Sequence, residues 1–103
     1  MSQIAHTRPP AQKVRRVESK KYIAWVRDQP SVISGQHGCD PHHIIAVGDG
    51  RMGSKASDLL TIPLTRTEHN ELHHDVRQWE SIHGSQWQHV AATLARYVAE
   101  RLG

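Results

Sequence analysis

The sequence contains one cysteine, no phenylalanine and no long apolar run. A single cysteine excludes a fold held together by internal disulfides and fits a reducing compartment. No apolar stretch approaches the roughly 18 residues of a membrane-spanning helix, and the first residues lack the apolar core of a secretory signal. We therefore expect a soluble, cytoplasmic protein that does not associate with a membrane.

The small share of hydrophobic residues limits the size of the core. They make up 37% of 103 residues, which is enough for one domain with a modest core. A core of this kind favours extra stabilisation by a metal ion or by a partner subunit. The sequence leaves the oligomeric state open.

Charge is unevenly distributed along the chain. Before Asp28 the only acidic residue is Glu18, whereas seven residues are basic: Arg8, Lys13, Arg15, Arg16, Lys20, Lys21 and Arg27. Residues 28–84 hold most of the acidic residues and seven of the nine histidines. We interpret residues 1–18 as a basic arm beside a His-rich domain over residues 19–103, an arrangement that suits a polyanionic partner. The alternative for the first twelve residues is a solvated tail.

Residue patterns in the first half predict a helix followed by two strands. Ser19 is expected to cap a short helix over residues 20–29, which Pro30 ends. Two short β-branched, apolar segments, residues 42–47 and 59–64, are expected to be strands. The glycine-rich segment between them is expected to be a loop, and it lacks the Gly-Lys-Ser/Thr ending of a P-loop.

Two helices are expected in the second half. Thr65 and Glu68 have the spacing of a capping box, so a helix should run from residue 66 to His83. A second helix is expected over residues 86–102. The expected apolar stripes are Leu72, Val76 and Trp79 in the first helix and Val90, Leu94, Val98 and Leu102 in the second. The predicted fold class is therefore α+β.

His69 and His73 are four residues apart in a predicted helix. Side chains at this spacing leave the same face one turn apart, so both imidazoles could bind one ion. The alternative is an ordinary polar helix face. A zinc protease is excluded, because its glutamate would directly follow the first histidine, whereas here the acid is Glu71.

His42 and His43 are neighbours in a predicted strand, so their side chains should point to opposite sides. One could bind a metal while the other accepts a proton, because a general base needs its lone pair free of the metal. Asp58 should lie near the strand end, where it could bind the ion or orient the base. The alternatives are two exposed strand histidines and a turn carboxylate.

The order of a strand with paired histidines, a loop, a strand and a helix with His-x-x-x-His is the layout of a ββα-metal site. The segment "HHII…GSKASDLLTIPLTRTEHNELHH" resembles the HNH endonuclease superfamily. The resemblance extends over roughly residues 19–90 and is closest to the phage and prophage branch that includes the RecA-dependent recombination-enhancement nuclease. It implies a ββα-metal core at about 40–83, with a short N-terminal helix and an additional C-terminal helix at about 86–102.

The resemblance also implies roles for individual residues. His42, His69 and His73 would bind one divalent metal ion, His43 would be the general base, and Asp58 stands at the superfamily's middle position. The implied activity is hydrolysis of DNA phosphodiester bonds, and a recombinase–DNA filament is a candidate partner. Imidazole ligands favour Zn, Ni or Mn, whereas Mg would need oxygen ligands from the substrate phosphate.

Three basic residues near the predicted site are candidates for binding the DNA backbone. Arg51 and Lys55 lie in the glycine-rich loop, and Arg66 lies at the helix start. No element that would read base edges is evident, so weak sequence specificity is expected. The alternative is ordinary surface charge.

The chain departs from the many HNH proteins that bind a structural zinc through cysteine pairs. Ser31 and Ser34 stand where one pair could have been, and Thr65 and Glu68 precede the helix histidines. Serine does not replace thiolate as a zinc ligand. Cys39 is therefore expected to be a small buried residue, or else a ligand together with His37.

This departure leaves two other functions open. One is a catalytically silent DNA-binding or recombination-accessory module that keeps the fold. The other is a zinc-stabilised structural module. A retained base histidine favours the enzyme, since neither alternative needs one.

Overall fold

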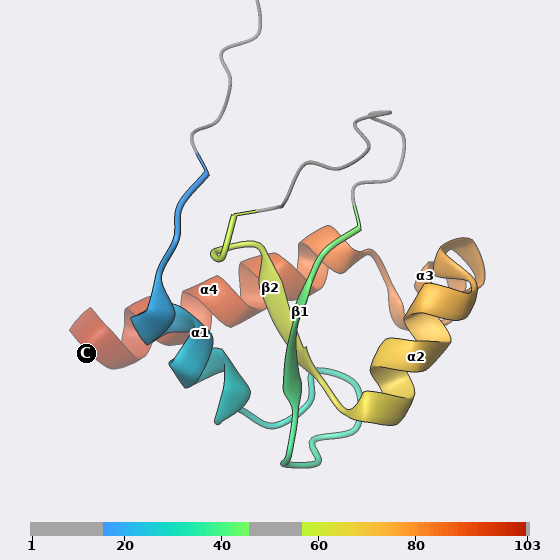
Figure 1. The fold of residues 1–103 in the computed structure, drawn as a ribbon, viewed down its shortest axis with the longest axis horizontal. Coiled ribbons are helices and arrows are strands. Elements are labelled where there is room, and N and C mark those ends of the chain that lie inside the picture. The colour runs from blue at the N-terminus through green and yellow to red at the C-terminus, as the bar shows by residue number, and fades with distance from the viewer. Residues whose placement is uncertain (1–15, 46–56, 103) are drawn as a thin grey trace, which may run out of the picture.

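The computed structural model describes residues 16–45 and 57–102, which have an α+β fold. The order of elements is α1 (Lys20–Arg27), β1 (Asp40–His43), β2 (Thr61–Leu64), α2 (Arg66–His74), α3 (Val76–His83) and α4 (Gln86–Leu102). In Figure 1 the two strands lie at the centre, α4 crosses behind them, and α2 and α3 lie together at one side. The predicted order of elements is therefore confirmed for these residues, apart from a break between α2 and α3.

The two strands form an antiparallel pair in which His42 lies opposite Ile62. Strand β1 begins two residues before the predicted segment 42–47 and ends at His43, and β2 is shorter than the predicted segment 59–64. Residues 46 and 47 of the first prediction lie outside the described residues. Pairing continues for one more hydrogen bond, from the Ile44 N–H to the Leu60 carbonyl at 3.0 Å. It then stops, because the Leu60 N–H turns back to donate to the carbonyl of Ser57.

Helix α1 begins at the predicted cap. The Ser19 hydroxyl accepts a hydrogen bond from the Tyr22 N–H at 3.1 Å, which satisfies one of the free donors of the first turn. The helix ends at Arg27, before Pro30. Trp25 is buried on the same side as Tyr22, and both rings contact Tyr97 of α4. Helix α1 is thereby held against the C-terminal half of α4.

The predicted single helix over residues 66–83 is wrong, because Asp75 divides it. The backbone of Asp75 is extended, with φ −156° and ψ 96°. Its side chain accepts a hydrogen bond from the Gln78 N–H at 3.0 Å, so it caps a new helix rather than continuing the old one. The short helix α2 thus carries the histidines, and α3 carries the buried Trp79.

The main core lies between the sheet and helices α2, α3 and α4. Its buried hydrophobic residues are Ile44, Ile62, Leu64, Leu72, Trp79 and Val90. The predicted stripe of α4 is correct only in its first half, since Val98 and Leu102 are 48% and 83% exposed. Thr93 is buried instead, and the helix extends past the sheet. Among the helices of the described residues, none is long and apolar enough to span a membrane.

Candidate metal centre

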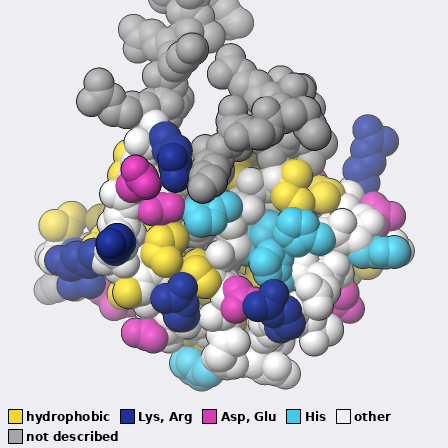
Figure 2. Space-filling view, in the orientation of Figure 1, with side chains coloured by type: hydrophobic (Ala, Val, Ile, Leu, Met, Phe, Trp, Pro, Cys, Tyr) yellow, Lys and Arg dark blue, Asp and Glu magenta, His cyan; other side chains and the backbone are white. Residues whose placement is uncertain are grey.

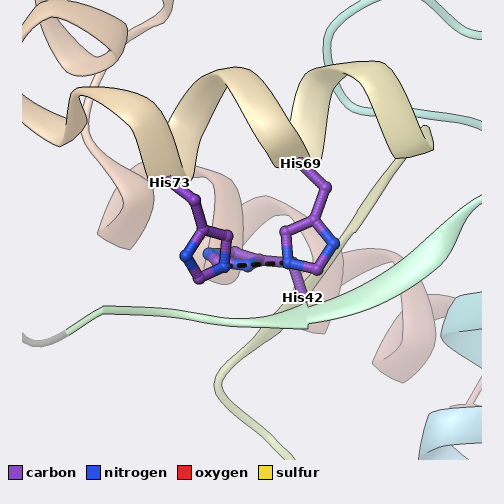
Figure 3. A group of neighbouring side chains, drawn as sticks. All are labelled: His42, His69 and His73. Atoms are coloured by element: carbon purple, nitrogen blue, oxygen red, sulfur yellow. Dashed lines mark hydrogen bonds between the residues drawn. The ribbon is translucent and has the colours of Figure 1, made fainter.

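Three histidines from two elements converge between β1 and α2. His42 comes from β1, whereas His69 and His73 come from successive turns of α2 (Figure 3). One nitrogen from each ring lies within 4.8 Å of the others. The Nε2 atoms of His69 and His73 are 3.0 Å apart. Three imidazoles this close together can bind a single divalent ion.

Local structure explains how these side chains reach one place. The capping box predicted from Thr65 and Glu68 is present, and it sets the start of α2 directly after β2. The spacing of four residues then directs His69 and His73 toward β1. On β1, the His42 side chain is buried and that of His43 is exposed, which agrees with the predicted opposite orientation of the two side chains.

The buried environment keeps His42 neutral. Its pKa is lowered to about 4, mainly by burial and also by the nearby His69 and His73, while a hydrogen bond with Gln86 acts in the opposite direction. The pKa of His69 is also lowered, by burial and by His73, while Asp40 partly opposes the shift. Neutral imidazole is the form that binds metals, so these rings could bind an ion near neutral pH.

Two polar residues surround the histidines. Gln86, the first residue of α4, is 1% exposed, and its Oε1 lies 3.2 Å from His42 Nε2. Asp40 Oδ2 lies 3.7 Å from His69 Nδ1 and 3.2 Å from Arg66 Nη2. Sequence reasoning missed both. The strand period could have indicated Asp40, since it lies two residues before His42, whereas nothing near Gln86 signals its role.

The second histidine of β1 makes a separate pair. His43 Nε2 lies 2.8 Å from Asp58 Oδ1, and the Ser19 N–H donates to Asp58 Oδ2 at 2.8 Å. These two hydrogen bonds lower the pKa of Asp58. Among the described residues, the candidate ligand group consists of the three histidines alone. Of the two roles considered for Asp58, the geometry therefore favours orienting His43 over binding the ion.

Charged side chains of both signs lie around the histidine face. In Figure 2 histidines gather near the middle of the view, with Lys and Arg as well as Asp and Glu side chains around them. The Arg66 side chain is 73% exposed while it pairs with Asp40. Arg51 and Lys55 lie outside the described residues.

A hydrogen-bonded polar cluster joins Ser31, Thr65 and Glu68. The Ser31 hydroxyl donates to Glu68 Oε1 at 2.5 Å, and the Thr65 N–H donates to the same oxygen at 2.9 Å. Burial alone would raise the pKa of Glu68, but these hydrogen bonds outweigh it and lower the pKa. Cys39 is buried, as expected, and its thiol donates to the Gln36 carbonyl at 3.3 Å. The cluster can therefore hold this region together through hydrogen bonds.

Comparison with known proteins adds a family match. The family described as "Protein of unknown function (DUF968)" matches residues 4–101. The chain is 44% identical over 87 residues to the uncharacterized protein YdfU of Escherichia coli K12, a match that covers 84% of the chain and 25% of that protein. The chain thus spans about a quarter of the length of this relative. No solved structure matches the chain.

Proposed function

Because the chain belongs to the DUF968 family of proteins of unknown function, we propose an activity from its own residues: it is a metal-dependent endonuclease of the HNH, or ββα-metal, type. One observation carries the proposal. Three histidines converge, and His43, the neighbour of His42 in β1, is paired with a carboxylate and exposed to solvent. This combination provides a metal site and a separate general base.

The donor set fits a divalent ion. Three imidazoles suit Zn, Ni or Mn, and Mg would require oxygen ligands from the substrate phosphate to complete its shell. A bound ion would stabilise the negative charge that develops on the phosphorus centre and on the leaving 3′ oxygen. His42, His69 and His73 would hold it through neutral ring nitrogens.

The His43–Asp58 pair supplies the base. An ionised Asp58 has no hydrogen to donate, so it must be the acceptor of this hydrogen bond. His43 Nε2 therefore carries the hydrogen and is the donor. The lone pair is then on Nδ1, which takes a proton from water. The hydroxide attacks phosphorus and the bond to the 3′ oxygen breaks. The leaving oxygen takes a proton from solvent, and His43 later returns its own proton to solvent. Asp58 orients the ring for this step.

The proposed substrate is DNA. Arg66 is well placed to contact a phosphate beside the histidines. For Arg51 and Lys55 we propose the same role from their positions in the sequence. Contacts to phosphates position the DNA without reading bases, so cleavage should show weak sequence specificity. A role in phage or prophage recombination or repair, with a recombinase–DNA filament as partner, belongs to the same proposal.

A plasmid-nicking assay tests the activity. Supercoiled DNA would be incubated with the wild type and with His43→Ala, in the presence of Mg, Mn, Ni or Zn. Loss of a general base typically reduces the rate by about 10²- to 10⁴-fold, so His43→Ala should be nearly inactive. His37→Ala, which changes an exposed histidine of the loop between α1 and β1, should nick like the wild type.

Two outcomes would contradict the proposal. Equal nicking by the wild type and His43→Ala would remove His43 from the reaction. DNA binding without nicking, with any of these ions and with a recombinase filament present, would instead identify a silent DNA-binding module.

A further inference from the structure

Gln86 makes a set of hydrogen bonds that determines how its side-chain amide is oriented. Its Oε1 accepts from the Ile45 N–H at 3.0 Å, and its Nε2 donates to the Ile45 carbonyl at 3.2 Å. A backbone N–H can only donate, and a carbonyl can only accept. The amide oxygen, and not its nitrogen, therefore faces His42.

This orientation dictates the protonation of His42. The amide oxygen has no hydrogen to donate, so His42 Nε2, at 3.2 Å, must carry the proton that joins them. The lone pair of the neutral ring is then on Nδ1. We propose that Gln86 is a positioning residue: it selects the Nε2–H tautomer of His42 and thereby makes Nδ1 the metal-binding atom. The inference rests on the metal site of the proposed function but not on nuclease activity.

The two α2 ligands present the other ring nitrogen. His69 Nδ1 faces the carboxylate of Asp40, and its Nε2 faces Nε2 of His73 at 3.0 Å. The proposed ligand atoms are therefore Nδ1 of His42 and Nε2 of both helix histidines. The hydrogen bond between His42 and Gln86 is of the kind that usually orients a histidine ligand, whereas Asp40 lies 3.7 Å from His69 Nδ1, beyond hydrogen-bond distance.

Gln86 also ties the metal site to the C-terminal helices. Its backbone N–H donates to Glu80 Oε2 of α3 at 2.9 Å, and its side chain is almost fully buried. The residue that orients His42 is thus anchored at the junction between α3 and α4. His42 of β1 is thus oriented by a residue of α4 that lies 44 positions further along the chain.

The tautomer can be measured directly in the wild type. Long-range ¹H–¹⁵N correlation spectra of the metal-free protein distinguish a protonated Nε2 from a protonated Nδ1. We expect His42 to be in the Nε2–H form. A wild-type His42 in the Nδ1–H form would overturn the proposal, and this result requires no variant to fold.

Gln86→Met removes the acceptor while approximately keeping the side-chain volume. We expect it to lose the single Nε2–H form of His42 and to bind zinc about 10- to 100-fold more weakly by calorimetry. Gln88→Met, an exposed position of the same helix, is the matched control and should change neither. Wild-type zinc affinity together with an unchanged tautomer in Gln86→Met would also overturn the proposal.

These results separate the inference from the nuclease proposal. A wild type that has the Nε2–H tautomer and binds zinc, but never nicks DNA, supports the role of Gln86 and contradicts only the nuclease. A nicking enzyme whose His42 carries its proton on Nδ1 supports the nuclease and overturns the role of Gln86.

Discussion

At the scale of single residues, the division of roles between His42 and His43 follows from their surroundings. His42 is buried beside two other imidazoles and next to an amide. His43 is partly exposed and hydrogen-bonded to a carboxylate. Burial keeps the first ring neutral and fixed, whereas the second is open to solvent. Two identical side chains thereby become suited to different chemistry.

The lowered pKa of His42 has a consequence for stability. Its pKa is about 4 in the folded protein, compared with 6.5 for the ordinary side chain. Between these values the unfolded chain holds a proton that the native state lacks, so stability falls as the pH falls. Without metal, the free energy of unfolding should decrease by about 2 kcal/mol between about pH 7.5 and about pH 5. Urea unfolding in the presence of a chelator measures this.

A variant isolates the contribution of His42. His42→Asn should show a smaller pH dependence over the same range, with the remainder coming mainly from His69, whose pKa is also lowered. The carboxylates Asp58 and Glu68 titrate at lower pH, so they contribute little in this window. A wild type that is equally stable at both pH values would refute the expectation.

At the scale of elements, caps determine where the helices lie. Thr65 and Glu68 form the capping box of α2, and the hydrogen bond from Ser31 to Glu68 also ties this cap to the loop that follows α1. Asp75 ends α2 and begins α3. The caps therefore set both ends of the helix that carries His69 and His73.

Replacing the cap of α3 should destabilise the protein. Asp75→Ala removes the acceptor of the Gln78 N–H, and loss of an N-cap typically costs about 1 kcal/mol. Asp75→Asn keeps an acceptor and should stay within a few tenths of a kcal/mol of the wild type. Denaturant unfolding measures both, with the exposed Arg77→Ala as control. A fully stable Asp75→Ala would mean that the cap contributes nothing.

At the scale of the whole molecule, the three histidines come from two different elements, the sheet and α2, of a fold with a small core. An ion bound only by the folded state would add to stability by mass action. At a free zinc concentration about 100 times the Kd, the gain is about 2.7 kcal/mol, which raises the Tm by on the order of 10 °C in a domain of this size. Thermal unfolding with and without zinc measures the shift.

Single-ligand variants are the control for this experiment. His69→Ala and His73→Ala should lose most of the zinc-dependent rise in Tm, while His37→Ala, outside the site, should keep it. An equal rise in all four proteins would indicate binding at the surface and not at the three-histidine site.

Several features of the fold were predictable because they depend on neighbours in the chain. The Ser19 cap, the capping box of α2 and the opposite orientation of His42 and His43 all follow from hydrogen bonds or periodicity within a few residues. The break at Asp75 was harder to predict, since an aspartate can lie within a helix or cap one. The burial of α4 depended on how far the helix extends past the sheet.

The sequence by itself determined which chemistry is available: three histidines at spacings that suit ligation, a fourth next to one of them, and the caps that start α1 and α2. Histidine spacings and helix caps depend on the geometry of residues close together in the chain, so any chain with the same local residues would share them. Only the tertiary structure decided that the three rings meet and that Asp58 pairs with His43. It also placed Gln86 next to Nε2 of His42 and Asp40 next to Nδ1 of His69. Most of these contacts join distant segments, and the packing of helices against the sheet brings them together.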